Sequence, residues 1–175
     1  MADEKLERFL EDIGAESHLR VEADLGDGFV RLRSSEAERR QAAQDIRSTE
    51  DIIIEMLRNA RDASATNIYV AVSREGQTRR ITMLDDGVGI PQAMHERVFE
   101  PRVTSKLDTF HMDKWGVHGR GMALYSIAVN AKHAEVISAA PDKGSSLYIE
   151  TDLTDLSEKV DQSTFPLFLQ GEHGV

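Results

Sequence analysis

The stretch that decides the fold runs from Thr49 to Ala65 and reads TEDIIIEMLRNARDASA. Its apolar residues recur at helical spacing, so we predict an amphipathic helix whose apolar stripe packs on a sheet. At about 100° per residue, Glu55, Asn59 and Asp62 fall on one face of this helix. A carboxylate, an amide and a second carboxylate therefore share one side. An ordinary solvated helix face with ion pairs has the same pattern, so the stripe alone leaves both readings open.

The composition is that of a globular chain with an acidic surface. The chain has 175 residues, of which 40% are hydrophobic and 30% are charged, and its formal net charge is −10. This length is typical of one domain and is sufficient for a hydrophobic core. Because so acidic a surface repels a phosphate backbone, we expect no direct nucleic-acid binding. Small anions need only a local group of backbone NH donors and a metal ion.

The sequence contains no cysteine, which excludes disulfides and thiolate metal sites and fits a cytoplasmic protein. The amino terminus is acidic and amphipathic, unlike a secretory signal, and no apolar stretch reaches the length of a membrane span. We therefore expect a cytoplasmic location and no membrane partner.

The rest of the chain is expected to supply a sheet and further helices. Helices are predicted over residues 2–13, 92–99 and 122–131, and over 37–46 with its start at Ser34. Strands are predicted over 67–73, 79–84, 134–139 and 146–152, and as an earlier hairpin of 18–24 with 29–33. Segment 101–118 lacks periodicity, and its length indicates a lid. Residues 1–47 are expected to pack on a domain formed by 48–152, and 153–175 to form a weak helix and tail.

Two glycine-containing motifs point to a nucleotide. DDGVGI begins at Asp85, directly after a predicted strand, where a carboxylate can accept a hydrogen bond from an adenine amino group. Its glycines, Gly87 and Gly89, would let the backbone approach a flat ligand. GVHGRG, residues 116–121, precedes a predicted helix, so its NH groups and the helix dipole can hold phosphate. Each motif alone also fits a plain turn or a hinge.

A nucleotide that spans both motifs would bring a Mg²⁺ ion, which keeps most of its ligands as phosphate and water. Asn59 suits the role of its single amide ligand. Glu55, one turn earlier on the same face, can bind and deprotonate a water molecule aimed at the terminal phosphate.

The ordered set ExxxNAxDA, DDGVGIP, TSK, GVHGRG and a late Gly-Ser resembles the GHKL superfamily, which includes DNA gyrase, MutL, the large heat-shock chaperones and sensor histidine kinases. The resemblance covers residues 48–152. It implies a Bergerat-type α/β two-layer sandwich, in which a mixed, mostly antiparallel sheet carries helices on one face. It also implies ATP as the substrate, Mg²⁺ as the cofactor, and a partner protein or dimerisation when ATP binds.

The resemblance assigns roles to individual residues. Glu55 would be the catalytic base, Asn59 the Mg²⁺ ligand and Asp85 the adenine-binding carboxylate. The other residues that the resemblance places around the nucleotide are Asp62, Gly87, Gly89, Ile90, Thr104, Ser105, Lys106, Gly116, Val117, His118, Gly119, Arg120, Gly121, Met122 and Ser145.

Glu55 separates the branches of the superfamily. Gyrase-like and MutL-like members have glutamate here and hydrolyse ATP, whereas histidine kinases generally have asparagine and pass the phosphate to a histidine. The segments VFEPRVTSK and GRGMAL nevertheless resemble the kinase lid. We therefore expect a Mg²⁺-dependent ATPase domain. The alternatives are the catalytic domain of a histidine or serine protein kinase and a non-catalytic nucleotide sensor.

Overall fold

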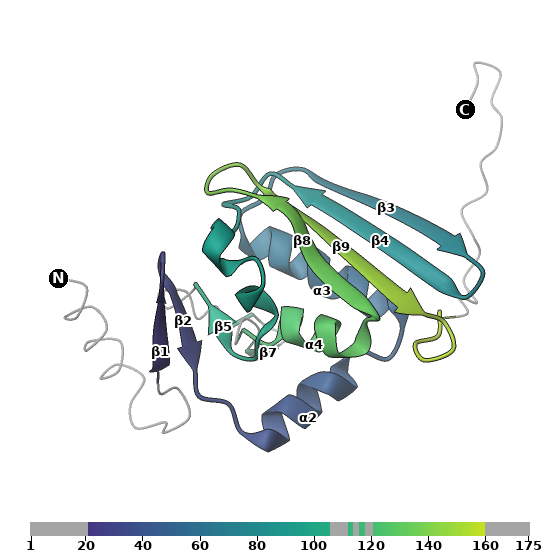
Figure 1. Ribbon diagram of the computed structural model, residues 1–175, viewed down its shortest axis with the longest axis horizontal. Helices are drawn as coiled ribbons and strands as arrows, with labels where there is room; N and C mark the ends of the chain where they lie inside the picture. Colours follow the sequence, from purple (N-terminus) through teal and green to yellow (C-terminus); the bar gives the residue numbers. More distant parts are fainter. Residues whose placement is uncertain (1–20, 106–111, 114–115, 118–120, 160–175) are drawn as a thin grey trace, which may run out of the picture.

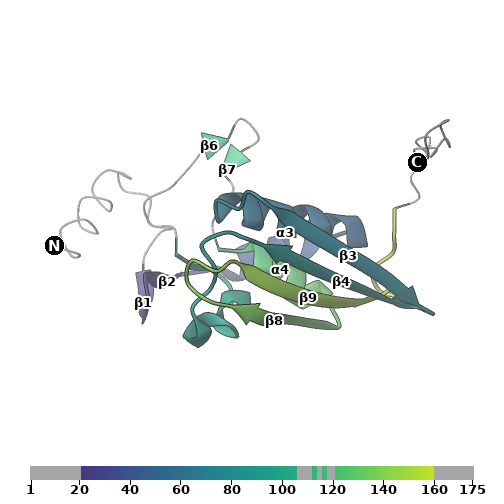
Figure 2. The same ribbon diagram turned by 90° about the horizontal axis from the view of Figure 1, so that it is seen from above.

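The computed structural model describes residues 21–105, 112–113, 116–117 and 121–159. They form a sheet with helices on one face, and an arm made of a hairpin and a helix lies beside them (Figure 1). Seen from above, the sheet is one layer, and α3 (Thr49–Asp62) and α4 (Ala123–Asn130) belong to the other (Figure 2). The expected two-layer α/β sandwich is therefore confirmed. The predicted helix 2–13 lies outside the described residues.

The main sheet has the strand order β3-β4-β9-β8, and each neighbouring pair is antiparallel. Its strands are β3 (Ile68–Glu75), β4 (Thr78–Asp85), β8 (His133–Ala139) and β9 (Ser145–Asp152). All four predicted strands are present, with ends that differ by one or two residues. The β3–β4 turn is tighter than expected, because Glu75 already pairs with Thr78.

The arm joins the domain through a second sheet. β1 (Val21–Gly26) and β2 (Phe29–Leu32) form the predicted antiparallel hairpin. β2 also pairs with β5 (Val103–Thr104), which lies at the start of the predicted lid. The arm therefore holds one end of the lid segment in place.

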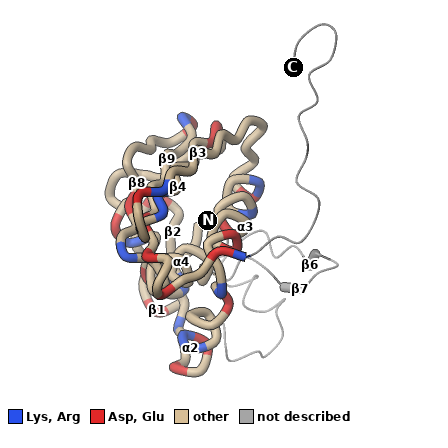
Figure 3. The backbone as a smooth tube through the Cα atoms, turned by 90° about the vertical axis from the view of Figure 1, so that its right-hand side faces the viewer, with Lys and Arg blue, Asp and Glu red and all other residues tan. Residues whose placement is uncertain are grey.

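Helix α2 (Glu36–Asp45) connects the hairpin to α3. It starts one residue later than predicted, because Ser35 rather than Ser34 is the N-cap and forms a capping box with Glu38. Acidic and basic residues are interspersed on this helix (Figure 3), where Glu36 pairs with Arg40 at 3.2 Å. None of the helices in the described part of the chain has the length and apolar character that crossing a membrane requires.

One predicted helix is corrected by the structure. Segment 92–99 consists of two 3₁₀ turns, η1 (Gln92–Met94) and η2 (Arg97–Phe99), and neither has a side-chain cap. So short an uncapped segment is a marginal α-helix, and the two turns instead bury Met94 and Val98. Of the predicted weak helix and tail over 153–175, residues 160–175 lie outside the described residues. Residues 153–156 form a turn and a bend, because the Asp152 carboxylate accepts hydrogen bonds from Thr154 and ends β9 with a local turn.

The core lies between the main sheet and the helices. Its buried side chains come from α3, β4, α4 and β9 and include Ile52, Met56, Ala60, Ile81, Met83, Ile127, Leu147 and Ile149. A second cluster joins Phe29 of the arm to Met94, Val98 and Val103. Leu57 is 39% exposed, because it lies on the flank of α3.

Candidate functional site

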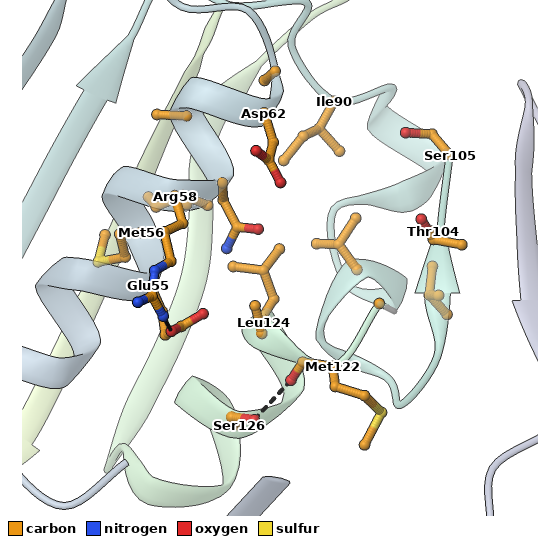
Figure 4. Close-up of a pocket in the computed structure, with 18 of the residues that line it drawn as sticks. Glu55, Met56, Arg58, Asp62, Ile90, Thr104, Ser105, Met122, Leu124 and Ser126 are labelled. Carbon is orange, nitrogen blue, oxygen red and sulfur yellow. Dashed lines mark hydrogen bonds and ion pairs between the residues drawn. The ribbon is translucent and has the colours of Figure 1, made fainter. Parts of the chain in front are cut away.

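A cavity of about 700 Å³ opens beside α3, within the size range of small-molecule sites. Figure 4 shows Glu55 and Asp62 of α3 on one side, Thr104 and Ser105 on the other, and Met122 and Leu124 at the start of α4. The sequence-predicted site residues that line this cavity are Glu55, Asn59, Asp62, Asp85, Gly89, Ile90, Thr104, Ser105, Gly121, Met122 and Ser145.

Helix α3 sets one wall of the cavity. Its N-cap Ser48 accepts a hydrogen bond from the Asp51 NH at 3.4 Å, which fixes where the helix begins. Glu55, Asn59 and Asp62 then all line the cavity, as their spacing predicts. The Glu55 carboxylate also forms an ion pair with Arg58, one turn further along the same helix.

The side-chain amide of Asn59 has unused hydrogen-bonding capacity. Its Nδ2 is buried and has no hydrogen-bond partner in the part of the chain that the structure describes. Leaving such a group unsatisfied costs about 1–3 kcal/mol. A bound ligand that accepts a hydrogen bond from this amide would remove that cost.

Asp85 lies at the end of β4 and is held by two hydrogen bonds. Its Oδ1 accepts the Gly87 NH at 2.9 Å, and its Oδ2 accepts the Ser145 hydroxyl at 2.5 Å. Ser145 is the cross-strand partner of Asp85 on β9. The carboxylate is therefore presented to the cavity in one orientation.

Gly87 and Gly89 are expected from the sequence to let the backbone approach a ligand. In the structure, both glycines also lie close to backbone atoms of other segments of the chain. A Cβ on Gly87 would lie 2.6 Å from the Ala63 carbonyl oxygen. Gly89 has φ +74°, and a Cβ there would lie 1.9 Å from the Ala140 carbonyl oxygen. The Val88 NH between them donates to the Ala63 carbonyl at 2.9 Å. Both glycines therefore fix the loop against the end of α3 and the β8–β9 connection.

Asp86 anchors the same loop from its other side. Its carboxylate accepts hydrogen bonds of 2.7–2.8 Å from the backbone NH groups and side chains of Thr66 and Asn67. These bonds, the one from the Asn67 backbone foremost, hold the pKa of Asp86 well below its usual value. The segment after α3 is thereby tied to the end of β4.

Arg102 lines the cavity and was not singled out from the sequence. It is only 1% exposed and has φ +62°. Its Nη2 pairs with Glu38 of α2, while Nε and Nη1 have no partner among the described residues. The sequence gives only an indirect signal, the Glu38 of the capping box, whose Oε2 caps α2 while Oε1 meets Arg102.

Glu38 itself is held ionised by its surroundings. Burial alone would raise its pKa, but the hydrogen bonds from Ser35 and the Arg102 guanidinium together outweigh burial and lower the pKa.

Only part of the predicted phosphate loop can be placed. Gly121 lines the cavity two residues before α4, and its φ is +67°. Gly116 and Val117 form β7 (Gly116–Val117), which pairs with β6 (Met112–Asp113). Four predicted site residues lie outside the described residues, namely Lys106, His118, Gly119 and Arg120.

A sheet covered by helices on one face, with a cavity lined by polar and apolar side chains beside α3, defines a two-layer α/β domain with room for a small molecule. The model of the family described as "Histidine kinase-, DNA gyrase B-, and HSP90-like ATPase" matches residues 46–170. The chain therefore belongs to this ATPase family, and the resemblance to the GHKL superfamily is confirmed.

The curated relatives include DNA mismatch repair proteins. MutL of Staphylococcus epidermidis is 33% identical over 123 residues, which are 68% of this chain and 19% of that protein. MutL of Aquifex pyrophilus is 35% identical over 109 residues, 59% of this chain and 25% of the relative. The chain thus spans about a fifth to a quarter of the length of these relatives.

Histidine kinases are found among the similar solved structures. The nucleotide-free catalytic domain of histidine kinase ThkA aligns with TM-score 0.36 and 18% identity over 58% of this chain and 63% of its own. Full-length ShkA in complex with AMPPNP aligns with TM-score 0.42 and 16% identity over 84% of this chain and 35% of its own.

Proposed function

We propose that the chain is a Mg²⁺-dependent ATPase domain that binds ATP in the cavity beside α3, with adenine at Asp85 and the phosphates near Asn59 and Gly121. The observation that carries this proposal is that one cavity is lined by Glu55, Asn59 and Asp85 together. Membership of the ATPase family supports ATP as the ligand.

The proposed binding of adenine is based on the geometry of Asp85. A carboxylate whose two oxygens are already oriented by Gly87 and Ser145 can accept a further hydrogen bond from the amino group of adenine. A guanine would present a carbonyl oxygen at that position and would be repelled. Ile90 and Val88 contribute apolar surface to the same cavity for the flat base.

The donor set fits Mg²⁺ bound to a nucleotide. No group of three or more His, Cys, Asp or Glu suited to a metal occurs among the described residues. Mg²⁺ that arrives with ATP needs only one or two protein ligands, and Asn59 would hold it through its amide oxygen. When bound, the ion would neutralise charge on the phosphate oxygens.

Glu55 is the proposed general base. It lies one helical turn before Asn59, so its carboxylate can accept a proton from a water molecule next to the terminal phosphate. The ion pair with Arg58 holds the carboxylate at the cavity wall. Gly121, two residues before α4, would add an NH donor for the phosphates next to the positive end of that helix.

The test replaces Glu55 with glutamine and measures ATP hydrolysis and ATP binding separately. We expect Glu55→Gln to lower the turnover rate by about 10²–10⁴-fold while ATP still binds. Glu75→Gln makes the same chemical change on exposed β3 and is expected to leave both unchanged.

Other outcomes would replace the proposal. Phosphate transfer from labelled ATP to a protein, unaffected by Glu55→Gln, would indicate the catalytic domain of a kinase. Tight ATP binding without turnover in the unaltered chain, under every condition tried, would indicate a nucleotide sensor.

A further inference from the structure

Four exposed apolar side chains lie on the side of α3 that faces away from the cavity. They are Ile54 (42% exposed) and Leu57 (39%) of α3, and Val70 (40%) and Val72 (45%) of β3. We call them the edge surface. Exposed apolar side chains that gather in one place, unlike scattered ones, mark an interaction site.

The positions of these residues follow from helix and strand geometry. At about 100° per residue, Leu57 and Asn59 lie on opposite flanks of α3 with Met56 between them. Val70 and Val72 pair with Met83 and Ile81, which are fully buried, so all four share the sheet face that carries the helices. β3 is at the edge of the sheet, and α3 packs on the neighbouring strand β4, behind the sheet in Figure 1. The helix layer therefore leaves this edge uncovered.

The described chain ends beside the edge surface. Glu158 pairs with Arg74, near the end of β3, at 3.4 Å. The next residue, Lys159, donates its NH to Glu50 in the first turn of α3 at 2.9 Å. Residues 158–159 therefore bridge β3 and α3 at one end of the edge surface.

The sequence that follows is suited to cover this surface. Residues 165–169 read FPLFL, four of them large and apolar. Five residues separate Lys159 from Phe165, and six residues of extended chain reach about 20 Å. Val72 and Val70 lie two and four strand residues from Arg74, or about 7–13 Å. The segment can therefore reach the edge surface without straining the chain.

We propose that residues 165–169 of this chain dock on its own edge surface and cover Ile54, Leu57, Val70 and Val72. The docked segment removes apolar area from water and shields an edge strand that would otherwise be open to pairing with other chains. It lies on the flank of α3 opposite Glu55 and Asn59, so the inference does not depend on the proposed ATPase activity.

The test uses the full chain, whose lack of cysteine allows clean labelling. One variant carries Val72→Cys with Leu167→Cys, and the two thiols are joined by a short flexible bis-maleimide. The matched control carries Ala71→Cys with Leu167→Cys, since successive strand residues point to opposite faces. Products are separated as single or double chains and mapped by mass spectrometry over a range of protein concentrations.

We expect single-chain cross-linking several-fold greater for the position 72 variant than for the control, at every concentration. Equal yields, or no cross-link in either variant, would overturn the proposal. Double-chain products that increase with concentration would overturn it as well, because they would place the segment of a second copy on the surface. If cysteine at position 72 impairs folding, Val70→Cys with Tyr69→Cys as its control gives the same comparison.

Discussion

Asp85 and Ser145 face each other across β4 and β9, and the Ser145 hydroxyl donates a hydrogen bond to the Asp85 carboxylate. One residue lies at the end of its strand and the other at the beginning, so sheet register alone places this pair at the cavity. Ser145 follows Gly144 of the β8–β9 turn, and Asp85 is the first residue of DDGVGI. Two segments distant in sequence therefore orient one carboxylate beside the cavity.

Replacing Asp85 by asparagine should weaken ATP binding. The substitution removes the charge and turns one acceptor into a donor, and a hydrogen bond to a charged group contributes about 1.5–3 kcal/mol, or roughly 10–100-fold in affinity. Isothermal titration calorimetry measures this loss. Asp142→Asn, in the β8–β9 turn at φ +58° where asparagine is tolerated, serves as the control and should bind ATP normally. Unchanged affinity in Asp85→Asn would remove Asp85 from the site.

Gly144 is expected to tolerate no side chain. Its φ is +77°, and a Cβ would lie 1.9 Å from the Asp85 carbonyl oxygen, so Gly144→Ala should displace the end of β4. We expect a loss of about 3 kcal/mol or more in the free energy of unfolding, measured in urea. Gly76→Ala is the matched control, since Gly76 has φ +59° but no atom within 4 Å of the added Cβ. It should lose only about 1–2 kcal/mol, and equal losses would show that φ rather than crowding matters.

Removing the charge of Glu38 should destabilise the junction between arm and domain. Arg102 would keep a buried positive charge without its partner, so Glu38→Gln should lower the free energy of unfolding by about 2–3 kcal/mol. Glu36→Gln, two residues earlier and more exposed on α2, should cost less than about 0.5 kcal/mol. Thermal and urea unfolding measure both, and a similar small effect in the two variants would contradict the structural role of Arg102.

Asp86 should make the free energy of unfolding depend on pH in the acidic range. Hydrogen bonds from Asn67 and Thr66 lower its pKa in the folded state below the usual 3.8, so the unfolded chain takes up the proton first as the pH falls. Its stabilising contribution is therefore complete well above pH 3.8 and is lost progressively below that value. The stability difference between the unaltered chain and Asp86→Asn should shrink as the pH falls through this range.

The control for this pH dependence is Asp27→Asn in the β1–β2 turn, at φ +52°. The difference in unfolding free energy between the unaltered chain and this control should change less with pH. A difference for Asp86→Asn that stays constant through acidification would contradict the assignment.

Much of the fold could be predicted because its signals are local. The period of α3 and the alternation in β3, β4, β8 and β9 each depend on neighbouring residues. The structure places the ends of these strands within two positions of the prediction, and α3 ends at Asp62, three residues before the predicted end at Ala65. Segment 92–99 was mistaken for a helix because its composition is helical, while the contacts that break it into two turns involve distant apolar residues.

Site residues could be predicted where they share one helix face or belong to a sequence motif. They could not be predicted where their place in the site depends on burial by distant segments. The spacing of Glu55, Asn59 and Asp62 places them on one wall, and their alignment along α3 follows from that alone. Arg102 was missed because nothing in its neighbours shows that β2 and α2 enclose it. The packing of Gly87 could not be predicted for a related reason: its close contact is with Ala63, distant in sequence.

The most direct test of the central claim is a calorimetric titration of the full chain with ATP, ADP and GTP, each with and without Mg²⁺. The account predicts that both adenine nucleotides bind, that GTP binds at least tenfold more weakly because Asp85 rejects its base carbonyl, and that Mg²⁺ strengthens ATP binding through Asn59. Asn59→Ala should abolish the Mg²⁺ dependence. Failure of ATP to bind, or equal binding of GTP, would contradict the account.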